Sequence, residues 1–364
     1  MLAEKSLYER VDKAALAPVE AALEHLDRPA AEAWLLSLEQ TEIYLKLTKD
    51  AEPDFRPEAA MPVTPAQLAG ARRILAAAIQ AEKAGGPKVA EALSKAVRSG
   101  RLQVWRLWGK KDGQLRVTRY FAARVAARHQ PGAPYTRALY RLPPDALRVD
   151  GKLPTKQQIH AGALDGKTKA IGYLTPESES ELHMEGSGIL EFDDGTEVAV
   201  NYEGNNGYAW GQEDEQVKAE LKAKHGSVPW SAWPLFKKRH TFHRALNLDE
   251  FKQLKLQAGQ YLGFDRPFLR KMPVQEGVST AMDPGLVPSG AVGLLIAKGS
   301  HRGRLIKVDD QGAAFIGRPD KIDLFWGSFT RQELKAEKRA DGTPLGNFPD
   351  YGDLYFLVES AGSN

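Results

Sequence analysis

Carboxylates stand out in the segment 307–327, where Asp309 and Asp310 follow an apolar strand pattern and Asp323 precedes a Leu-Phe-Trp run. A glycine after the two aspartates frees the chain to turn. We expect Asp310 at the mouth of a barrel among apolar side chains, including Trp326. Because a low-dielectric environment disfavours the charged carboxylate, such an aspartate could be protonated near neutral pH and act as a general acid. A turn-forming Asp-Asp-x-Gly sequence is the alternative interpretation.

A second polar cluster consists of Glu185-Gly-Ser-Gly188 and Tyr202-Glu-Gly-Asn-Asn-Gly207, on either side of an expected hairpin. Glycines permit close approach of a ligand, asparagines donate and accept hydrogen bonds, and aromatic faces can stack on sugar rings. Two elaborate turns without a ligand remain the alternative.

Several reaction classes lose support because their motifs are absent. The sequence has no phosphate-binding loop, no dinucleotide fingerprint and no His-Glu-x-x-His helix. Gly186-Ser187-Gly188 lacks the glycine of a nucleophile elbow. The chain has no cysteine, which removes thiol nucleophiles, disulfides and cysteine-held zinc. His240 and His243 lie in a basic stretch that opposes a metal, so we expect a solvated or backbone-bonded face there, no metal and no cofactor.

Composition narrows the class of protein further. The 364 residues include 50 Lys plus Arg and 47 Asp plus Glu, so the net charge of +3 gives no strong attraction to nucleic acid. No stretch approaches the roughly 20 apolar residues of a membrane span. The start of the sequence shows no apolar signal region, so an exported protein would have lost its signal before Met1.

The elements that must position these residues change in type along the chain. Residues 2–48 and 64–99 show helical spacing, with Thr64-Pro65 as a helix start, and predict a packing or spacing region. From residue 102 onward short alternating runs predict strands, as does a hairpin around Asp193-Asp194-Gly195. The expected strands are 102–108, 115–126, 135–141, 189–192, 197–202, 291–296, 304–308, 322–326 and 354–358, and the expected later helices are 212–225 and 247–262. Without regular βαβ alternation, this pattern favours one or two β-barrels.

Taken in order, these segments resemble the MltA family of lytic murein transglycosylases, from about Val117 to Leu357. The resemblance rests on several motifs that occur in the family's order: Tyr135–Pro144, Leu153–Leu164, Met184–Gly188, Tyr202–Gly207, Val278–Gly290, Asp310–Gly317 and Asp323–Gly327.

The resemblance implies a mainly β fold with helices: two β-barrel-type domains, one of them a double-psi β-barrel, plus a helical N-terminal region. The expected domains are 1–103 (helical), 104–140 with 265–364 (double-psi barrel) and 141–264 (inserted β-domain), with a glycan groove between the β-domains.

The implied activity is a lytic transglycosylase that cleaves the β-1,4 bond between N-acetylmuramic acid and N-acetylglucosamine and forms 1,6-anhydromuramyl products. Asp310 would be the acid and base, and Asp323 would tune it. The expected substrate-binding residues are Tyr120, Glu185, Gly186, Ser187, Gly188, Asn205, Asn206, Gly207, Asp283, Gln311 and Trp326. The partner would be peptidoglycan, without metal, cofactor or nucleic acid.

The chain also departs from the family pattern. Arg119-Tyr-Phe-Ala-Ala123 replaces Gly-Tyr-Tyr-Thr-Pro, and Glu185 replaces a glutamine. A non-catalytic glycan-binding cell-wall protein with a degenerate groove is therefore the alternative, and a barwin- or expansin-like barrel for another polysaccharide is a third. Location in the periplasm or cell envelope is expected, with anchoring through a segment that precedes this sequence.

Overall fold

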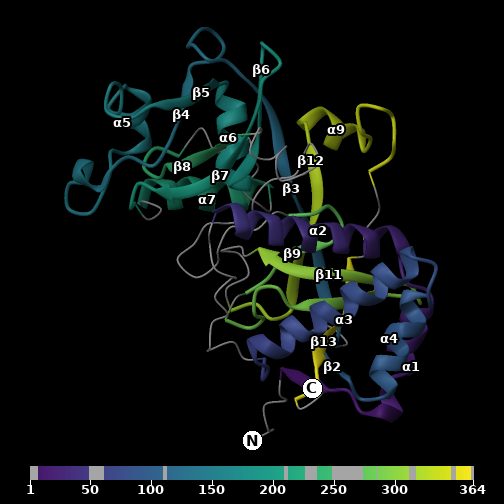
Figure 1. Ribbon diagram of the computed structural model, residues 1–364. Coiled ribbons are helices and arrows are strands. Elements are labelled where there is room, and N and C mark those ends of the chain that lie inside the picture. Colours follow the sequence, from purple (N-terminus) through teal and green to yellow (C-terminus); the bar gives the residue numbers. More distant parts are fainter. Residues whose placement is uncertain are drawn as a thin grey trace, which may run out of the picture. The chain divides into compact units, whose positions relative to one another are not determined.

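The computed structural model describes residues 7–48, 61–109, 113–208, 212–225, 236–247, 274–283, 285–310, 317–345 and 350–361. The chain forms two compact units (Figure 1). Unit 1 comprises Met1–Tyr120, Pro267–Gly327 and Gly346–Asn364, and unit 2 comprises Phe121–Arg266 and Ser328–Leu345. Strands β3 (Leu115–Ala127) and β12 (Lys321–Phe329) pass from one unit into the other.

Unit 1 contains a closed β-barrel. Its strands are β3, β13 (Tyr351–Glu359), β10 (Val292–Ala297), β11 (Gly303–Asp310), β9 (Ser279–Ala281) and β12. Each strand in this series pairs with the next, and β12 pairs with β3. Because β3 also pairs with β13, the sheet closes on itself. The pair β9 and β11 is parallel, whereas β9 and β12 are antiparallel. Two further strands, β2 (Leu102–Leu107) and β1 (Tyr8–Arg10), extend the sheet beyond β13.

The barrel strands are buried on both faces. Along β13, Leu354 and Phe356 belong to the cluster that fills the barrel, whereas Tyr355 and Leu357 belong to a second cluster shared with helices. Alternate side chains of a strand point to opposite faces. A strand covered on both faces therefore reads as a nearly continuous apolar run, which explains the sequence Leu-Tyr-Phe-Leu-Val.

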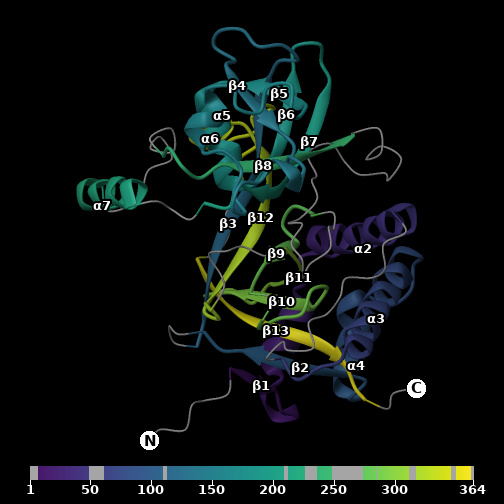
Figure 2. The ribbon, with the colours of Figure 1, turned by 90° about the vertical axis from the view of Figure 1, so that its left-hand side faces the viewer.

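Four helices form the outer cover of unit 1 (Figure 2). They are α1 (Ala17–Glu24), α2 (Arg28–Thr48), α3 (Pro65–Lys83) and α4 (Val89–Arg98). Thr64 caps α3: its hydroxyl accepts from the Gln67 backbone N–H, and the Gln67 side chain accepts from the Thr64 N–H. Leu23, Trp34 and Leu75 are buried against barrel residues.

Unit 2 contains a sheet in the order β3, β6 (Ser187–Phe192), β7 (Glu197–Asn205) and β8 (Thr241–Asn247), in which β3 and β6 are parallel. A second sheet pairs β4 (Arg137–Tyr140) with β5 (Ala170–Leu174). The helices of this unit are α5 (Lys156–His160), α6 (Pro176–Glu185), α7 (Gln212–His225) and α9 (Arg331–Ala336).

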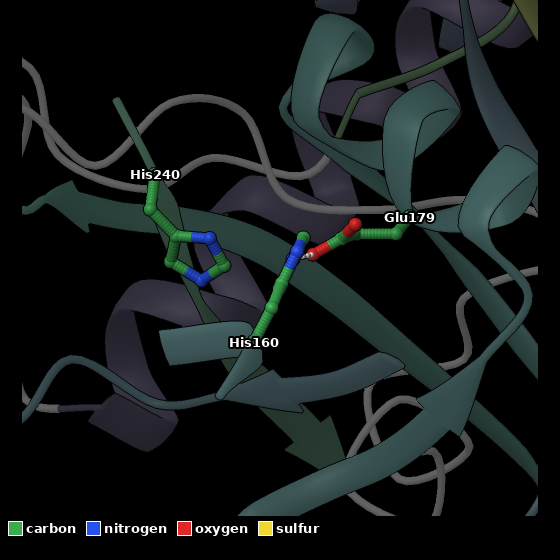
Figure 3. Close-up of side chains that lie close together, drawn as sticks. All are labelled: His160, Glu179 and His240. Carbon is green, nitrogen blue, oxygen red and sulfur yellow. Dashed lines mark hydrogen bonds and ion pairs between the residues drawn. The ribbon is translucent and has the colours of Figure 1, made fainter. Parts of the chain in front are cut away.

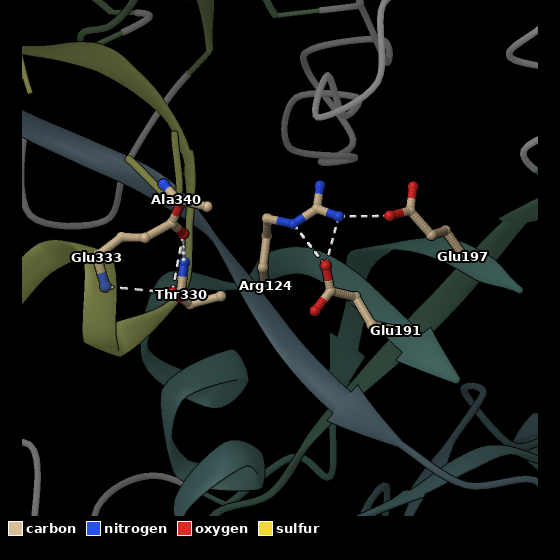
Figure 4. A network of polar contacts seen from close by, with 6 residues as sticks. All are labelled: Arg124, Glu191, Glu197, Thr330, Glu333 and Ala340. Atoms are coloured by element: carbon tan, nitrogen blue, oxygen red, sulfur yellow. Dashed lines mark hydrogen bonds and ion pairs between the residues drawn. The ribbon is translucent and has the colours of Figure 1, made fainter. Parts of the chain in front are cut away.

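Arg124 links three strands of unit 2 (Figure 4). From β3, its guanidinium donates to Glu191 on β6, with Nε to Oε1 at 2.7 Å, and to Glu197 on β7. In the same view, Glu333 accepts from the Thr330 backbone N–H at 2.8 Å and from the Ala340 N–H at 2.8 Å, which holds α9 and the turn after it.

The expected fold class, mainly β with helices and barrel-type domains, is confirmed, and so is the hairpin of β6 and β7. Helix α6 and strands β1 and β8 were not predicted from the sequence. The expected helix 247–262 lies outside the described residues except Asn247, which ends β8. No helix in the described parts of the chain is long and apolar enough to cross a membrane.

Candidate active site

The two aspartates singled out in the sequence flank the same residue of the barrel in unit 1. Asp310 of β11 and Asp323 of β12 both pair with Ala281 of β9, one from each side. Residues directly opposite in adjacent strands face the same side of a sheet, so both carboxyl groups project from the face that carries the Ala281 side chain.

A β-bulge sets the direction of Asp310. Val308 pairs with Thr280 and Asp310 with Ala281, so Asp309 is the extra residue of β11. Bulges re-aim side chains, and they are common beside active sites. Asp310 is 1% exposed, and its carbonyl accepts from the Met282 N–H at 3.2 Å.

The bulged residue Asp309 is held in a buried polar network. Its carboxylate accepts from the Ser279 hydroxyl at 2.5 Å and lies 3.3 Å from the Lys307 ammonium. Burial raises the pKa of Asp309 and lowers that of Lys307, while the attraction between the two groups opposes both shifts. This network fixes the strand end that carries Asp310.

Asp323 lies in an environment suited to proton chemistry. Burial raises its pKa to about 6, although a hydrogen bond from Thr118 and the positive charge of Lys321 act in the opposite direction. A carboxyl group with such a pKa changes charge near the pH at which most enzymes work.

Asp283 follows β9 and holds a turn together. Its Oδ1 accepts from the Gly285 N–H at 2.9 Å and its Oδ2 from the Gly317 N–H at 2.6 Å. Gln311, another expected site residue, lies outside the described residues.

The two aromatic residues expected in the site, Tyr120 and Trp326, lie on β3 and β12 in unit 1. The ring of Tyr120 is 5.3 Å from that of Phe325. The guanidinium of Arg119 stands over the Trp326 ring, 4.2 Å from its centroid. One face of Trp326 is therefore covered by the arginine at which this chain departs from the family pattern.

The Glu185-Gly-Ser-Gly188 motif lies in unit 2, at the junction of α6 and β6. Gly186 ends α6 in the left-handed conformation (φ +78°). A Cβ on Gly188 would stand 2.4 Å from Leu182 Cδ2 and 2.5 Å from the Ala123 carbonyl oxygen. Ser187 is buried. Gly186 is thus required by its backbone conformation and Gly188 by close packing.

The Asn-Asn-Gly motif lies after β7 in the same unit. Asn205 donates to the Tyr202 hydroxyl at 3.0 Å and accepts from the Gly207 N–H at 2.8 Å. Asn206 is fully buried: it donates to the carbonyls of Pro154 and Lys238 and accepts from the His240 N–H. The Asn206 amide therefore connects three stretches of backbone.

Of the expected solvated or backbone-bonded face at His240 and His243, the solvated alternative is wrong, because both side chains are buried. Burial lowers the pKa of His240 to about 3 and that of His243 to about 4. His240 lies near His160 and Glu179, which the sequence analysis did not single out. Because these three residues lie far apart in the sequence, no sequence pattern indicated that they would come together.

A closed barrel with one parallel strand pair and a bulged aspartate strand, together with a second β-unit, defines the class: mainly β proteins with barrel-type domains and helices. Residues 116–213 match the family described as the MltA specific insert domain. Over this stretch the chain is similar to the MltA family.

Two curated relatives are similar to parts of this chain. The membrane-bound lytic murein transglycosylase A of Vibrio cholerae serotype O1 is 28% identical over 249 residues, 63% of each chain. The protein of the same name from Escherichia coli K12 is 30% identical over 116 residues, 30% of this chain and 29% of its own. The chain thus spans less than two thirds of the length of these relatives.

Solved structures extend the likeness in fold over nearly the whole chain. MltA of Escherichia coli with bound chitohexaose has a TM-score of 0.58 at 17% identity and 90% coverage of both chains. The membrane-bound lytic murein transglycosylase of Agrobacterium tumefaciens has a TM-score of 0.58 at 17% identity, with 97% coverage of both. MltA of Neisseria gonorrhoeae has a TM-score of 0.58 at 16% identity, covering 98% of this chain and 93% of its own.

Proposed function

We propose that this protein is a peptidoglycan lytic transglycosylase, with Asp310 as its acid and base. It cleaves the β-1,4 bond between N-acetylmuramic acid and N-acetylglucosamine and leaves a 1,6-anhydromuramyl end. The observation that carries the proposal is the buried Asp310 at the bulged end of β11, in register with Asp323 across Ala281. Similarity to two relatives that are named lytic murein transglycosylases supports it.

One carboxyl group is enough for this reaction. Protonated Asp310 donates to the glycosidic oxygen, the bond from that oxygen to muramyl C1 breaks, and the N-acetylglucosamine residue leaves with a free 4-hydroxyl. The muramyl 6-hydroxyl then attacks C1 and returns its proton to Asp310. Because the nucleophile belongs to the substrate, no second carboxylate has to hold a water, unlike in an inverting hydrolase.

Asp323 tunes Asp310 in this proposal. With its own pKa near 6, it changes charge across the working range of pH. Asp323 would act on Asp310 through its charge, because both carboxyl groups project from the same face of the sheet.

We propose glycan-contacting residues for each unit by itself. In unit 1 we assign contact to Tyr120, Trp326 and Gln311, and to Asp283 a role in shaping the loop. In unit 2 we assign contact to Glu185 and Asn205, while Gly186, Ser187, Gly188, Asn206 and Gly207 hold the backbone that presents them. Chitohexaose, bound to the Escherichia coli relative, is also a glycan.

We also propose that the protein is located in the cell envelope, in the periplasm. The curated relatives are named membrane-bound.

Digestion of purified peptidoglycan followed by mass spectrometry tests the function. We expect 1,6-anhydromuropeptides, and a loss of at least about 100-fold in their rate of formation in D310N, the scale typical of a removed general acid. D341N, in an exposed turn, is the matched control and should keep the wild-type rate.

Other products would point to other functions. Reducing muramyl ends would mean hydrolysis by water. Binding of peptidoglycan without any product would favour the non-catalytic glycan-binding protein. Full activity in D310N would overturn the assignment of this aspartate.

A further inference from the structure

A buried cluster in unit 2 brings together two histidines and a glutamate from three elements (Figure 3). His160 ends α5, Glu179 lies in α6, and His240 directly precedes β8. One nitrogen or oxygen atom of each side chain lies within 4.8 Å of those of the other two. His160 Nε2 is 2.7 Å from Glu179 Oε1.

The imidazole of His240 lacks a partner of its own. It is 1% exposed, and neither ring nitrogen makes a hydrogen bond to any described residue. The same holds for His183, whose ring centroid is 4.7 Å from that of His240. A buried polar atom without a partner is destabilising, so a ligand that engages these nitrogens would be stabilising.

The backbone around the cluster is held firmly. Asn206 accepts from the His240 N–H at 3.0 Å, and the Asn206 N–H donates to the His240 carbonyl at 3.1 Å. The first two residues of α5 donate to the segment just before His240: Lys156 N–H to the Lys238 carbonyl at 3.0 Å and Gln157 N–H to the Lys237 carbonyl at 2.9 Å. The His240 backbone and the start of α5 are thus fixed before any ligand arrives.

We propose that His160, Glu179 and His240 form a binding site for a divalent transition-metal ion, with Zn²⁺ as the best-fitting example. Two imidazoles and one carboxylate are a common ligand set for Zn²⁺. At metal–ligand distances near 2.1 Å, tetrahedral ligand atoms lie about 3.4 Å apart, so small side-chain rotations complete the geometry. The hydrogen bond between His160 and Glu179 opens on binding, and any proton shared there leaves to solvent.

The site is structural, and it does not depend on the proposed transglycosylase reaction. The ion would tie α5 and α6 to the start of β8 within unit 2. The catalytic candidates Asp310 and Asp323 belong to unit 1. Loss of this site and loss of the catalytic assignment are therefore separate outcomes.

Lys156 limits the affinity. It is 1% exposed, and its charge acts on Glu179, His183 and His240. A buried ammonium repels a cation, so we expect weaker binding than at a histidine site without such a neighbour.

Zinc titration of the full chain, stripped of metal by a chelator and dialysed, tests the proposal. We expect one Zn²⁺ per chain in competition with a chromophoric chelator, and a rise in the melting temperature that Mg²⁺ does not reproduce, since Mg²⁺ prefers oxygen ligands. Co²⁺ bound in place of Zn²⁺ should give the visible absorption of a tetrahedral site.

The variants H160Q and E179Q should weaken Zn²⁺ binding by at least about 100-fold, because even residues that only support a ligand contribute about 10–100-fold. H129Q is the matched control: His129 pairs with Asp194 at the surface, and its loss should leave binding unchanged. Circular dichroism of the metal-free variants checks folding. The side chain of His160 is 21% exposed, so H160Q is the better tolerated change.

Three results would overturn the proposal. These are wild-type protein that binds no Zn²⁺ at micromolar concentrations, folded H160Q that binds as tightly as wild type, and binding lost in H129Q but kept in H160Q, which would place the ion at the surface.

Discussion

Asp310 and Asp323 share Ala281 as a neighbour, yet their settings differ. Asp310 ends a bulged strand whose previous residue is fixed by Lys307 and Ser279. Asp323 lies within β12, where burial raises its pKa to about 6 despite the hydrogen bond from Thr118. A raised carboxyl pKa is also a cost in stability at neutral pH, and this cost can be measured.

D323N should be more stable than the wild type at neutral pH. The pKa of Asp323 is about 6 in the folded protein and 3.8 as its reference value, so between these values the folded state holds more protons than the unfolded state. Wild-type stability therefore falls as pH rises through this window. The amide cannot ionise, so we expect a gain of about 1–3 kcal/mol in the free energy of unfolding above about pH 7.

Urea unfolding, followed by tryptophan fluorescence at several pH values, measures this difference. The gain of D323N over the wild type should vanish by about pH 4. D150N is the control, because Asp150 is exposed and its left-handed backbone suits asparagine. A pH-independent difference between D323N and the wild type would mean that packing, and not charge, explains the effect.

The sequence could place Asp310 and Asp323 beside strands because each lies next to an apolar run that predicts a strand. It could not predict the partners of Asp309, since Ser279 and Lys307 meet it only through the parallel pairing of β9 with β11. The histidine cluster was hidden for the same reason: tertiary folding brings its members together from three elements.

At the scale of elements, the Gly-Ser-Gly motif connects α6 to β6 and sets how closely β6 approaches β3. From the sequence, we expected the glycines of this motif to permit close approach of a ligand. In the structure, Gly188 faces Leu182 and the carbonyl of Ala123, and Gly186 adopts the positive φ that ends α6. Close packing explains the glycine at 188 and the positive φ explains the glycine at 186, without a ligand.

G188A should destabilise unit 2. Its Cβ would stand 2.5 Å from a backbone oxygen of β3, which cannot move without disturbing the parallel pairing of β3 with β6. We expect a loss of about 3 kcal/mol, the upper end of the usual cost of overpacking, seen as a lower melting temperature in calorimetry.

G132A is the matched control for this change. A Cβ on Gly132 meets nothing within 4 Å, so this variant should be neutral or slightly more stable. If G188A melted like the wild type but bound less glycan, the close-packing explanation would be wrong and the ligand explanation would return.

The elements that the sequence predicted well are those with a clear period or a strong turn. The hairpin of β6 and β7 has Asp-Gly at its turn, and α3 begins with a threonine cap and proline. Helix α6 was missed because Pro-Glu-Ser-Glu-Ser-Glu-Leu-His-Met-Glu has no apolar stripe. Strand β8 was missed because its first residues, Thr241 to Arg244, lie in a stretch that reads as basic and solvated.

At the scale of the whole molecule, the helical N-terminal region is part of the barrel unit. The sequence left open whether it packs or only spaces. Leu75 of α3 belongs to the same buried cluster as Leu294 of β10 and Leu357 of β13. These barrel strands carry apolar residues on their outer face, and the helices keep that face from water. Sequence periodicity showed the helices but not the surface that they cover.

L75D tests this dependence of the barrel on its helices. Leu75 is fully buried, so the new carboxylate would lack water and an opposite charge, and we expect a loss of at least about 4 kcal/mol. Hydrogen exchange should then quicken in β10 and β13, which lie far from position 75 in sequence. A77D, two residues further on the exposed face of α3, is the control and should leave exchange unchanged. If L75D loosened α3 alone while β10 and β13 stayed protected, the helices would be a spacer and the barrel would be stable by itself.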